Sequence, residues 1–199
     1  MANGEERSAA TTNRILDAAV SCFQRAGIDK TTMSDIISES GLARTTVYRY
    51  FPVKDDIISQ VVLRDIDYLV QYLDTIRAPH EDIEAQLVET LYFTISEIGK
   101  RPVLAELFSQ DPIRLNKLGL SNEIVMAYTH KSIKPTYDLI KAARRLRDGV
   151  NLEDFSEWCG RVIMSFVITP YQYQGNPERM RSYIENYIVP SLLRQGGAS

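Results

Sequence analysis

Apolar residues recur through most of the chain at intervals of three and four positions, the spacing that places side chains on one side of an α-helix. The first apolar stripe consists of Ile15, Ala19, Cys22, Phe23 and Ala26. Gly27 follows this stripe and can end the helix. The chain shows neither sustained alternation of apolar and polar residues nor a hairpin dipeptide between β-branched runs. The pattern therefore predicts an all-α protein.

Two short helices are predicted after Gly27, and a sharp turn separates them. Thr31 or Thr32 can cap the second helix, and Gly41 can end it in the left-handed conformation. The apolar stripe of the second helix consists of Met33, Ile36, Ile37 and Ser40. In the turn and the third helix, which ends before Pro52, the inward-facing residues are Leu42, Val47 and Phe51.

The third helix is expected to expose a polar and cationic face, because so short a helix has only one buried stripe. The outward residues are Arg44, Thr45, Thr46, Tyr48 and Arg49, with Tyr50 at the edge. A helix, a turn and a second helix with such a face are what recognition of the DNA major groove requires. A groove about 12 Å wide admits one helix, and arginine matches the edge of guanine.

A merely solvated helix surface is the alternative interpretation of these charges. Against it, the two tyrosines stand beside arginines, and no acidic residue occurs between Gly41 and Asp55. The distribution of charge gives mild support to DNA contact. The chain has a net charge of −3, but up to Lys54 it carries seven basic and six acidic residues, a difference of +1. A first module that faces phosphate fits this asymmetry.

The segment TTMSDIISESGLARTTVYRYFPVKDDI, Thr31 to Ile57, resembles the helix-turn-helix of the TetR family of bacterial transcription regulators. The matching positions are Thr32, Ile36, Gly41, Leu42, Val47, Tyr48, Tyr50, Phe51, Lys54 and Asp55. The chain departs from the family at Thr45, where many relatives carry a smaller residue, and Arg49 occupies a variable position. The resemblance implies a DNA-binding domain of three helices in residues 1–53 and a helical effector-binding and dimerisation domain in residues 54–199.

The resemblance also assigns roles to the residues of the first domain. Those expected to hold phosphates are Thr32, Tyr48, Tyr50 and Lys54. Those expected to contact base edges are Arg44, Thr45, Thr46 and Arg49. A single half-site of this size is too short for specificity in a genome, so we expect a dimer on a near-palindromic operator.

Helical stripes continue beyond Lys54. One long helix is predicted from there to Pro79, followed by a central helix over residues 83–98 and a short helix that Pro102 opens. The segment from Gln110 to Leu120 is the longest irregular stretch, and we expect it to be mobile. Helix resumes at Asn122, with Pro135 kinking or splitting it, and ends in the basic run KAARRLRDG, whose cations suit a helix C-terminus. Asn151 and Asn176 cap the last two predicted helices.

Two sets of residues in the second region have alternative interpretations. Aromatic and apolar residues at helical spacing are usually ordinary core, but the resemblance implies a pocket for a small, largely hydrophobic effector that releases the repressor. The candidate pocket residues are Leu69, Tyr72, Tyr92, Phe108, Tyr128 and Trp158. The final two helices either pack against the same chain or form the dimer interface, and the resemblance favours the dimer. The candidate interface residues are Phe155, Val162, Phe166, Ile184, Tyr187 and Ile188.

An enzyme and a helical adaptor without sequence-specific DNA binding are the rival functions. His80 and His130 are the only histidines and have no metal-ligand spacing, so we expect no catalytic site, metal or cofactor. Cys22 and Cys159 are expected to be buried and unpaired. No apolar run approaches the roughly 18 residues of a membrane span, and the N-terminus lacks a secretory signal. We therefore expect a cytoplasmic protein.

Overall fold

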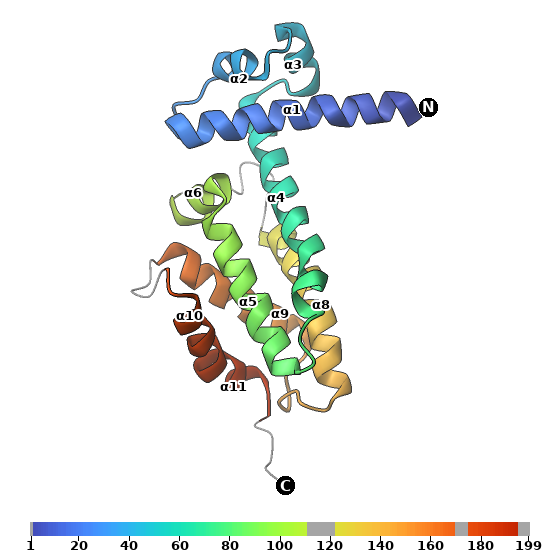
Figure 1. The fold of residues 1–199 in the computed structure, drawn as a ribbon, viewed down its shortest axis with the longest axis vertical. Coiled ribbons are helices and arrows are strands. Elements are labelled where there is room, and N and C mark those ends of the chain that lie inside the picture. The colour runs from blue at the N-terminus through green and yellow to red at the C-terminus, as the bar shows by residue number, and fades with distance from the viewer. Residues whose placement is uncertain (1, 111–121, 170–174, 195–199) are drawn as a thin grey trace.

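A computed structural model describes residues 2–110, 122–169 and 175–194, and these ranges are helical throughout apart from short connections (Figure 1). The helices are α1 (Ala2–Ala26), α2 (Met33–Ser40), α3 (Arg44–Tyr50), α4 (Lys54–Arg77), α5 (Ile83–Gly99), α6 (Pro102–Gln110), α8 (Asn122–Ala142), α9 (Leu152–Ile168), α10 (Pro177–Tyr183), the π-helical turn η1 (Ile184–Ile188) and α11 (Val189–Leu192). The prediction of an all-α fold is confirmed. Apart from Gln110, the stretch predicted to be mobile lies outside the described residues.

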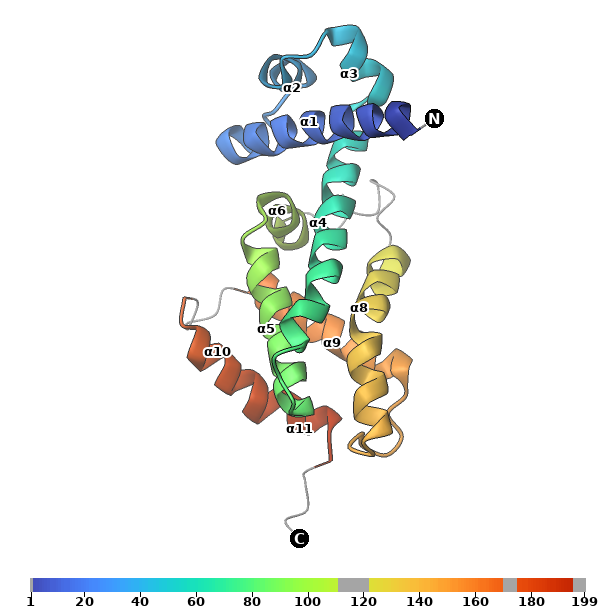
Figure 2. The same cartoon turned by 45° about the vertical axis from the view of Figure 1, so that its right-hand side comes forward.

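The first three helices lie at one end of the molecule, with α2 packed against α1 and α3 on the same side of α1 as α2 (Figure 1). From this end α4 runs down between α5 and α8 (Figure 2). It has 24 residues, which corresponds to a length of about 36 Å. The long helix therefore joins the first three helices to the remainder of the chain.

Buried apolar residues form two clusters. The first joins α1, α2, α3 and α4 as far as Leu69, and it also takes in Ile98 of α5 and Val103, Leu104 and Leu107 of α6. The second is built from α5, α8, α9 and the C-terminal helices. Ile163 of α9 packs against both clusters. The helix-turn-helix therefore does not have a core of its own, because α4 and α6 complete it.

The central position predicted for α5 follows from its composition. It buries side chains on several sides, and it contacts α4, α6, α8, α9 and the C-terminal helices. Pro135 was predicted to kink or split its helix; splitting is wrong, since α8 runs through that residue as one helix. A proline removes only one backbone N–H from the hydrogen-bond ladder, and α8 is held on either side of it by the buried residues Ile133, Tyr137 and Ile140.

The last helix starts at Pro177, as predicted, but contains a π-helical turn that the pattern did not reveal. The N–H of Val189 bonds to the carbonyl of Ile184, five residues earlier. Pro190, the next residue, has no N–H with which to continue an ordinary ladder. The π-helical turn has one more residue than an α-helical turn, so the side chains after it point in other directions than a regular α-helix would give them.

Both cysteines are buried and unpaired, as predicted. Burial raises the pKa of the Cys159 thiol to about 12, so this thiol stays protonated at neutral pH. Across the described ranges, no helix combines the length and the apolar character that crossing a membrane requires.

Candidate nucleic-acid interface

The start of α2 is set by a reciprocal pair of hydrogen bonds between Thr32 and Asp35. The N–H of Asp35 donates to Oγ1 of Thr32 at 3.2 Å, and the N–H of Thr32 donates to Oδ2 of Asp35 at 2.8 Å. The hydroxyl of Thr32 also donates to Oδ2 of Asp35, at 2.7 Å. These bonds lower the pKa of the Asp35 carboxyl. The last of these bonds uses the hydroxyl proton of Thr32. Thr32 can therefore donate this proton to a phosphate only if its hydroxyl rotates away from Asp35.

The turn between α2 and α3 depends on Gly41, which has a φ of 62° and donates its N–H to the carbonyl of Ser38. A left-handed residue at this point reverses the chain in one step, so α3 starts at Arg44. Val47 is fully buried and Phe51 nearly so, which fixes which side of α3 faces the core. The sequence-based orientation of this helix is therefore reproduced in the structure.

The opposite side of α3 carries exposed side chains that we call the recognition face: Arg44, Thr45, Tyr48 and Arg49. The guanidinium carbon of Arg44 lies 5.3 Å from the centre of the Tyr48 ring, and that of Arg49 lies 5.4 Å from the centre of the Tyr50 ring. Among the residues that the structure describes, neither arginine has a carboxylate within ion-pair distance. Arg44 donates one hydrogen bond to the Tyr48 hydroxyl, at 3.5 Å, and Arg49 shares one with Tyr50. The two cations are therefore held along aromatic rings and not by carboxylates.

Thr46 and Tyr50 lie at the edge of the recognition face and are half-buried. Hydrogen bonds with the hydroxyls of Ser8 and Thr11 on α1 lower the pKa of the Tyr50 phenol. The end of α3 is thus tied to the N-terminal part of α1, a contact that the sequence did not indicate.

The prediction that Lys54 holds a phosphate does not fit the structure. Its ammonium donates to the carbonyls of Ile28 and Thr31, each at 2.8 Å, and to the carbonyl of Asp29 at 3.4 Å. These three bonds use all three protons of the ammonium. Lys54 instead joins the start of α4 to the connection between α1 and α2.

The residues predicted for an effector pocket are not all placed to line one. Tyr72 and Trp158 are exposed, whereas Leu69 is buried in the first cluster. Tyr92 is half-buried beneath the guanidinium of Arg181, 3.7 Å from the ring centre. Tyr128 is half-buried; burial raises the pKa of its phenol, and Asp67, which shares a hydrogen bond with it, raises this pKa further. The side chain of Phe108 lies outside the described part of the chain.

Most of the residues predicted for a dimer interface belong instead to the chain's own core. Phe155, Val162, Ile184 and Ile188 are buried in the second cluster, because the apolar stripes of α9 and η1 face α5 and α8. Of the predicted set, Tyr187 is 70% exposed and Phe166 is half-buried. Phe155, Val162, Ile184 and Ile188 therefore pack within their own chain, which is the alternative to the dimer interface.

The last helices carry four aromatic side chains that we call the aromatic face: the exposed Trp158, Tyr183 and Tyr187, and the half-buried Phe166. Nε1 of Trp158 donates to Oγ of Ser191 at 2.9 Å. At the other end, the rings of Phe166 and Tyr183 meet edge to face at 5.7 Å, and Tyr183 lies 4.8 Å from Tyr187. Tyr183 was not among the residues predicted from the sequence, and Trp158 was predicted for the pocket, although Tyr183 and Tyr187 are four positions apart in the sequence.

Comparison with known proteins agrees with this geometry. Residues 15–61 match the family model described as "Bacterial regulatory proteins, tetR family". An uncharacterised HTH-type transcriptional regulator of Bacillus subtilis, YfiR, is 34% identical over 145 residues, which cover 71% of this chain and 66% of the relative. An HTH-type transcriptional regulator of Staphylococcus aureus strain USA300 is 28% identical over 92 residues, which cover 46% of this chain and 50% of the relative. The chain thus spans between half and two thirds of these relatives.

Solved structures share the fold at low sequence identity. A TetR-family transcriptional regulator from Pectobacterium atrosepticum has a TM-score of 0.74 at 15% identity, covering 96% of this chain and 97% of that one. The fatty acid degradation regulator FadR from Bacillus halodurans has a TM-score of 0.69 at 16% identity, covering 89% and 95%. The names of the relatives describe regulators rather than enzymes. The helix-turn-helix of residues 32–51 and the helical remainder agree with these matches, and the chain belongs to the TetR family of bacterial regulatory proteins.

Proposed function

We propose that this regulator is a repressor that binds a near-palindromic operator as a dimer and is released by a small, largely hydrophobic effector. In this proposal residues 1–53 form the DNA-binding domain and residues 54–199 the effector-binding and dimerisation domain. The recognition face is the observation that carries it, because two arginines and two hydroxyl-bearing residues are exposed there without an acidic partner among the described residues.

In the proposed complex α3 enters the major groove. Arg44 and Arg49 donate to base edges, where a bidentate contact with guanine discriminates by about 1–3 kcal/mol. Thr45 and Thr46 lie beside them, and we propose that Tyr48, Tyr50 and Thr32 contact phosphates. For Tyr50 and Thr32 this contact requires the hydroxyl to exchange its present partner on α1 or at Asp35 for a phosphate oxygen. Removing an arginine that contacts a base relaxes sequence preference, whereas removing a phosphate contact weakens binding to every sequence.

The proposal is tested by selecting genomic fragments of the source organism on the purified protein. Binding of the enriched duplex is then compared with that of a shuffled duplex at several salt concentrations. The variant Arg49→Ala is measured beside Lys131→Ala, which removes an exposed cation from α8. We expect a palindromic site, a specificity ratio of about 10³ or more, and a loss with Arg49→Ala alone. Binding that ignores both the sequence and Arg49 would favour the adaptor hypothesis.

The aromatic face supports the dimer. A strip of exposed aromatic rings over two packed helices is characteristic of an interaction surface, since such rings are enriched at the centres of interfaces. Two copies that meet through the aromatic face would each keep a recognition face, on α3 at the other end of the molecule. The two recognition faces would then bind the two half-sites of one operator. The interface we propose is therefore the aromatic face rather than the buried residues Phe155, Val162, Ile184 and Ile188.

Release by an effector is proposed to act through α4. Arg64 of this helix pairs with Asp17 of α1 at 2.7 Å, and Asp65 pairs with Arg101, directly before α6, at 2.9 Å. On its other side, Asp67 is bonded to Tyr128 of α8. A ligand that displaced α6 or α8 would therefore pull on α4, and through it on α1 and the recognition face.

Tyr92 and Tyr128 are the described pocket candidates that keep this role in the proposal, because both are half-buried and carry a phenol that can orient an otherwise apolar ligand. Tyr72 and Trp158 lose it, because their rings are exposed. The fatty acid degradation regulator among the solved neighbours is consistent with a hydrophobic effector.

A further inference from the structure

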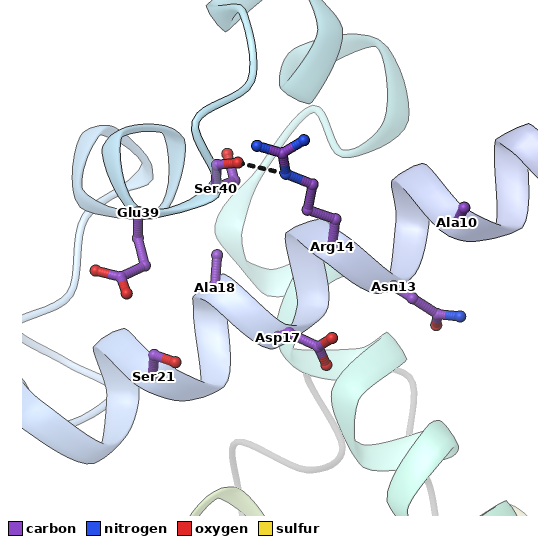
Figure 3. A pocket seen from close by; sticks show the side chains of 8 residues that line it. All are labelled: Ala10, Asn13, Arg14, Asp17, Ala18, Ser21, Glu39 and Ser40. Atoms are coloured by element: carbon purple, nitrogen blue, oxygen red, sulfur yellow. Dashed lines mark hydrogen bonds between the residues drawn. The ribbon is translucent and has the colours of Figure 1, made fainter.

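Arg14 on α1 extends over the end of α2 and is separate from the recognition face (Figure 3). Its Nε donates to the carbonyl of Ser40, the last residue of α2, at 2.7 Å. The two residues are 26 positions apart in the sequence. The contact is therefore tertiary, and it joins the middle of α1 to the point where the helix-turn-helix reverses.

The end of α2 requires such a donor. The last four carbonyls of a helix lack partners within it, and their partial negative charge favours a cation. Two of these carbonyls are satisfied locally, since Ser40 Oγ donates to Ile37 and the N–H of Gly41 donates to Ser38. The last turn of α2 contains no basic residue. Arg14 supplies from another helix the cation that α2 itself lacks.

Gly41 leaves room for the guanidinium. A Cβ atom placed on Gly41 would lie 3.0 Å from Nη2 of Arg14, which is tighter than an ordinary van der Waals contact. The φ of 62° already favours glycine at this position. In this chain the turn glycine therefore has two functions, because it reverses the backbone and admits the arginine.

The surroundings argue against Arg14 as a site for a bound anion. A shallow pocket of about 420 Å³ adjoins it, lined by Ala10, Asn13, Arg14, Asp17, Ala18, Ser21, Glu39 and Ser40 (Figure 3). Its two carboxylates would repel an anion. Asp17 pairs with Arg64 and Glu39 pairs with Arg25, so neither draws Arg14 away from the carbonyl of Ser40.

We propose that Arg14 is a positioning residue for the recognition face. By holding the carbonyl of Ser40 and covering Gly41, it fixes the turn between α2 and α3 against α1, and hence the angle at which α3 is presented. Arg14 does this without contacting DNA. The expected consequence for DNA binding rests on the proposed function. The effect of Arg14 on the turn can be measured in the free protein.

The test compares Arg14→Met with Arg25→Met. Both arginines extend from α1 to the end of α2, but Arg25 reaches α2 through an exposed ion pair with Glu39, at 3.0 Å, and its other contact, with Sγ of Cys22, lies within α1. Amide hydrogen exchange of Gly41 and Leu42 is measured in the free protein, because both N–H groups are bonded within the turn. We expect Arg14→Met to accelerate this exchange by about tenfold, the equivalent of one charge-assisted hydrogen bond. Arg25→Met should change it by less than about twofold.

Binding of the selected duplex supplies the second measurement. Arg14→Met should lower specific affinity by about tenfold while leaving nonspecific affinity and the salt dependence as in the wild type. Arg14→Lys keeps the charge and one donor, and it should restore most of the loss. A salt slope reduced by about 0.9 with unchanged exchange would instead identify Arg14 as a phosphate contact and overturn the proposal.

The double variant Arg14→Met/Gly41→Ala separates the two functions of the glycine. If the guanidinium occupies the space over Gly41, the cost of Gly41→Ala is smaller in the Arg14→Met background than in the wild type. Additive costs would contradict the proposed contact. If the wild-type protein bound no duplex at all, the proposed function would fail. The exchange measurements would still show whether Arg14 stabilises the turn at Gly41 and Leu42. Unchanged exchange in Arg14→Met would overturn the inference on its own.

Discussion

The recognition face and the aromatic face are both exposed, but they are built in different ways. The recognition face lies on one helix of seven residues, α3, and exposes cations and hydroxyls. The aromatic face combines α9 with the C-terminal helices, and its continuity depends on the contacts of Trp158 with Ser191 and of Phe166 with Tyr183. A surface carried by one helix is determined by local periodicity, whereas a surface shared by two helices depends on how they pack.

The largest expected effect is on self-association and tests the aromatic face alone. Tyr187→Asp places a charge in the centre of the aromatic face, where the tyrosine is 70% exposed in one chain. We expect the dissociation constant of the proposed dimer to rise by about 100-fold, as for the loss of an interface hot spot. Sedimentation velocity measures it. Tyr72→Asp alters another exposed aromatic residue, on α4, and should leave the dimer intact; equal weakening by both variants would place the interface elsewhere.

The next largest effect is on stability, and it tests whether Lys54 contacts the backbone of its own chain or a phosphate. Lys54→Met removes three hydrogen bonds from an ammonium to backbone carbonyls. We expect the free energy of unfolding to fall by about 2 kcal/mol, as measured by urea denaturation, with the salt dependence of DNA binding unchanged. Lys30→Met removes an exposed lysine from the same connection and should have little effect on stability. A reduced salt slope for Lys54→Met would return this residue to the phosphate contacts.

A smaller effect is expected within the recognition face itself. Arg44→Ala should lower the affinity for the operator by about tenfold per half-site and relax preference at one base pair, as expected for a base contact. Competition binding with duplexes substituted at single positions measures both. The control is Arg147→Ala, an exposed arginine in the connection after α8. Uniform weakening across all duplexes would assign Arg44 to phosphate rather than to a base.

The smallest effect concerns the continuity of the aromatic face. Ser191→Ala removes the acceptor for the indole N–H of Trp158, and we expect a loss of about 1 kcal/mol in unfolding free energy and a few-fold weaker dimer. Ser165→Ala is matched to it, since that hydroxyl bonds only to the backbone of its own helix, at Val162. A dimer unaffected by Ser191→Ala would show that the orientation of Trp158 does not contribute to association.

Several features of this protein followed from the sequence by itself, because each depends on neighbours within about one helical turn. The cap at Thr32, the reversal at Gly41 and the inward side of α3 at Val47 are of this kind. The spacing of apolar residues likewise determined the helical class and the central position of α5.

Only the tertiary structure decided which surfaces remain exposed. The stripe with Phe155 and Ile184 is equally apolar whether it faces α5 and α8 or a second chain, so periodicity could not assign it. The bonds of Lys54 to the carbonyls of residues 28–31, and of Arg14 to Ser40, join positions 23 to 26 residues apart. Periodicity records which side of a helix is apolar, but the partner of that side, and of each long cationic side chain, is set by packing between helices that are distant in the chain.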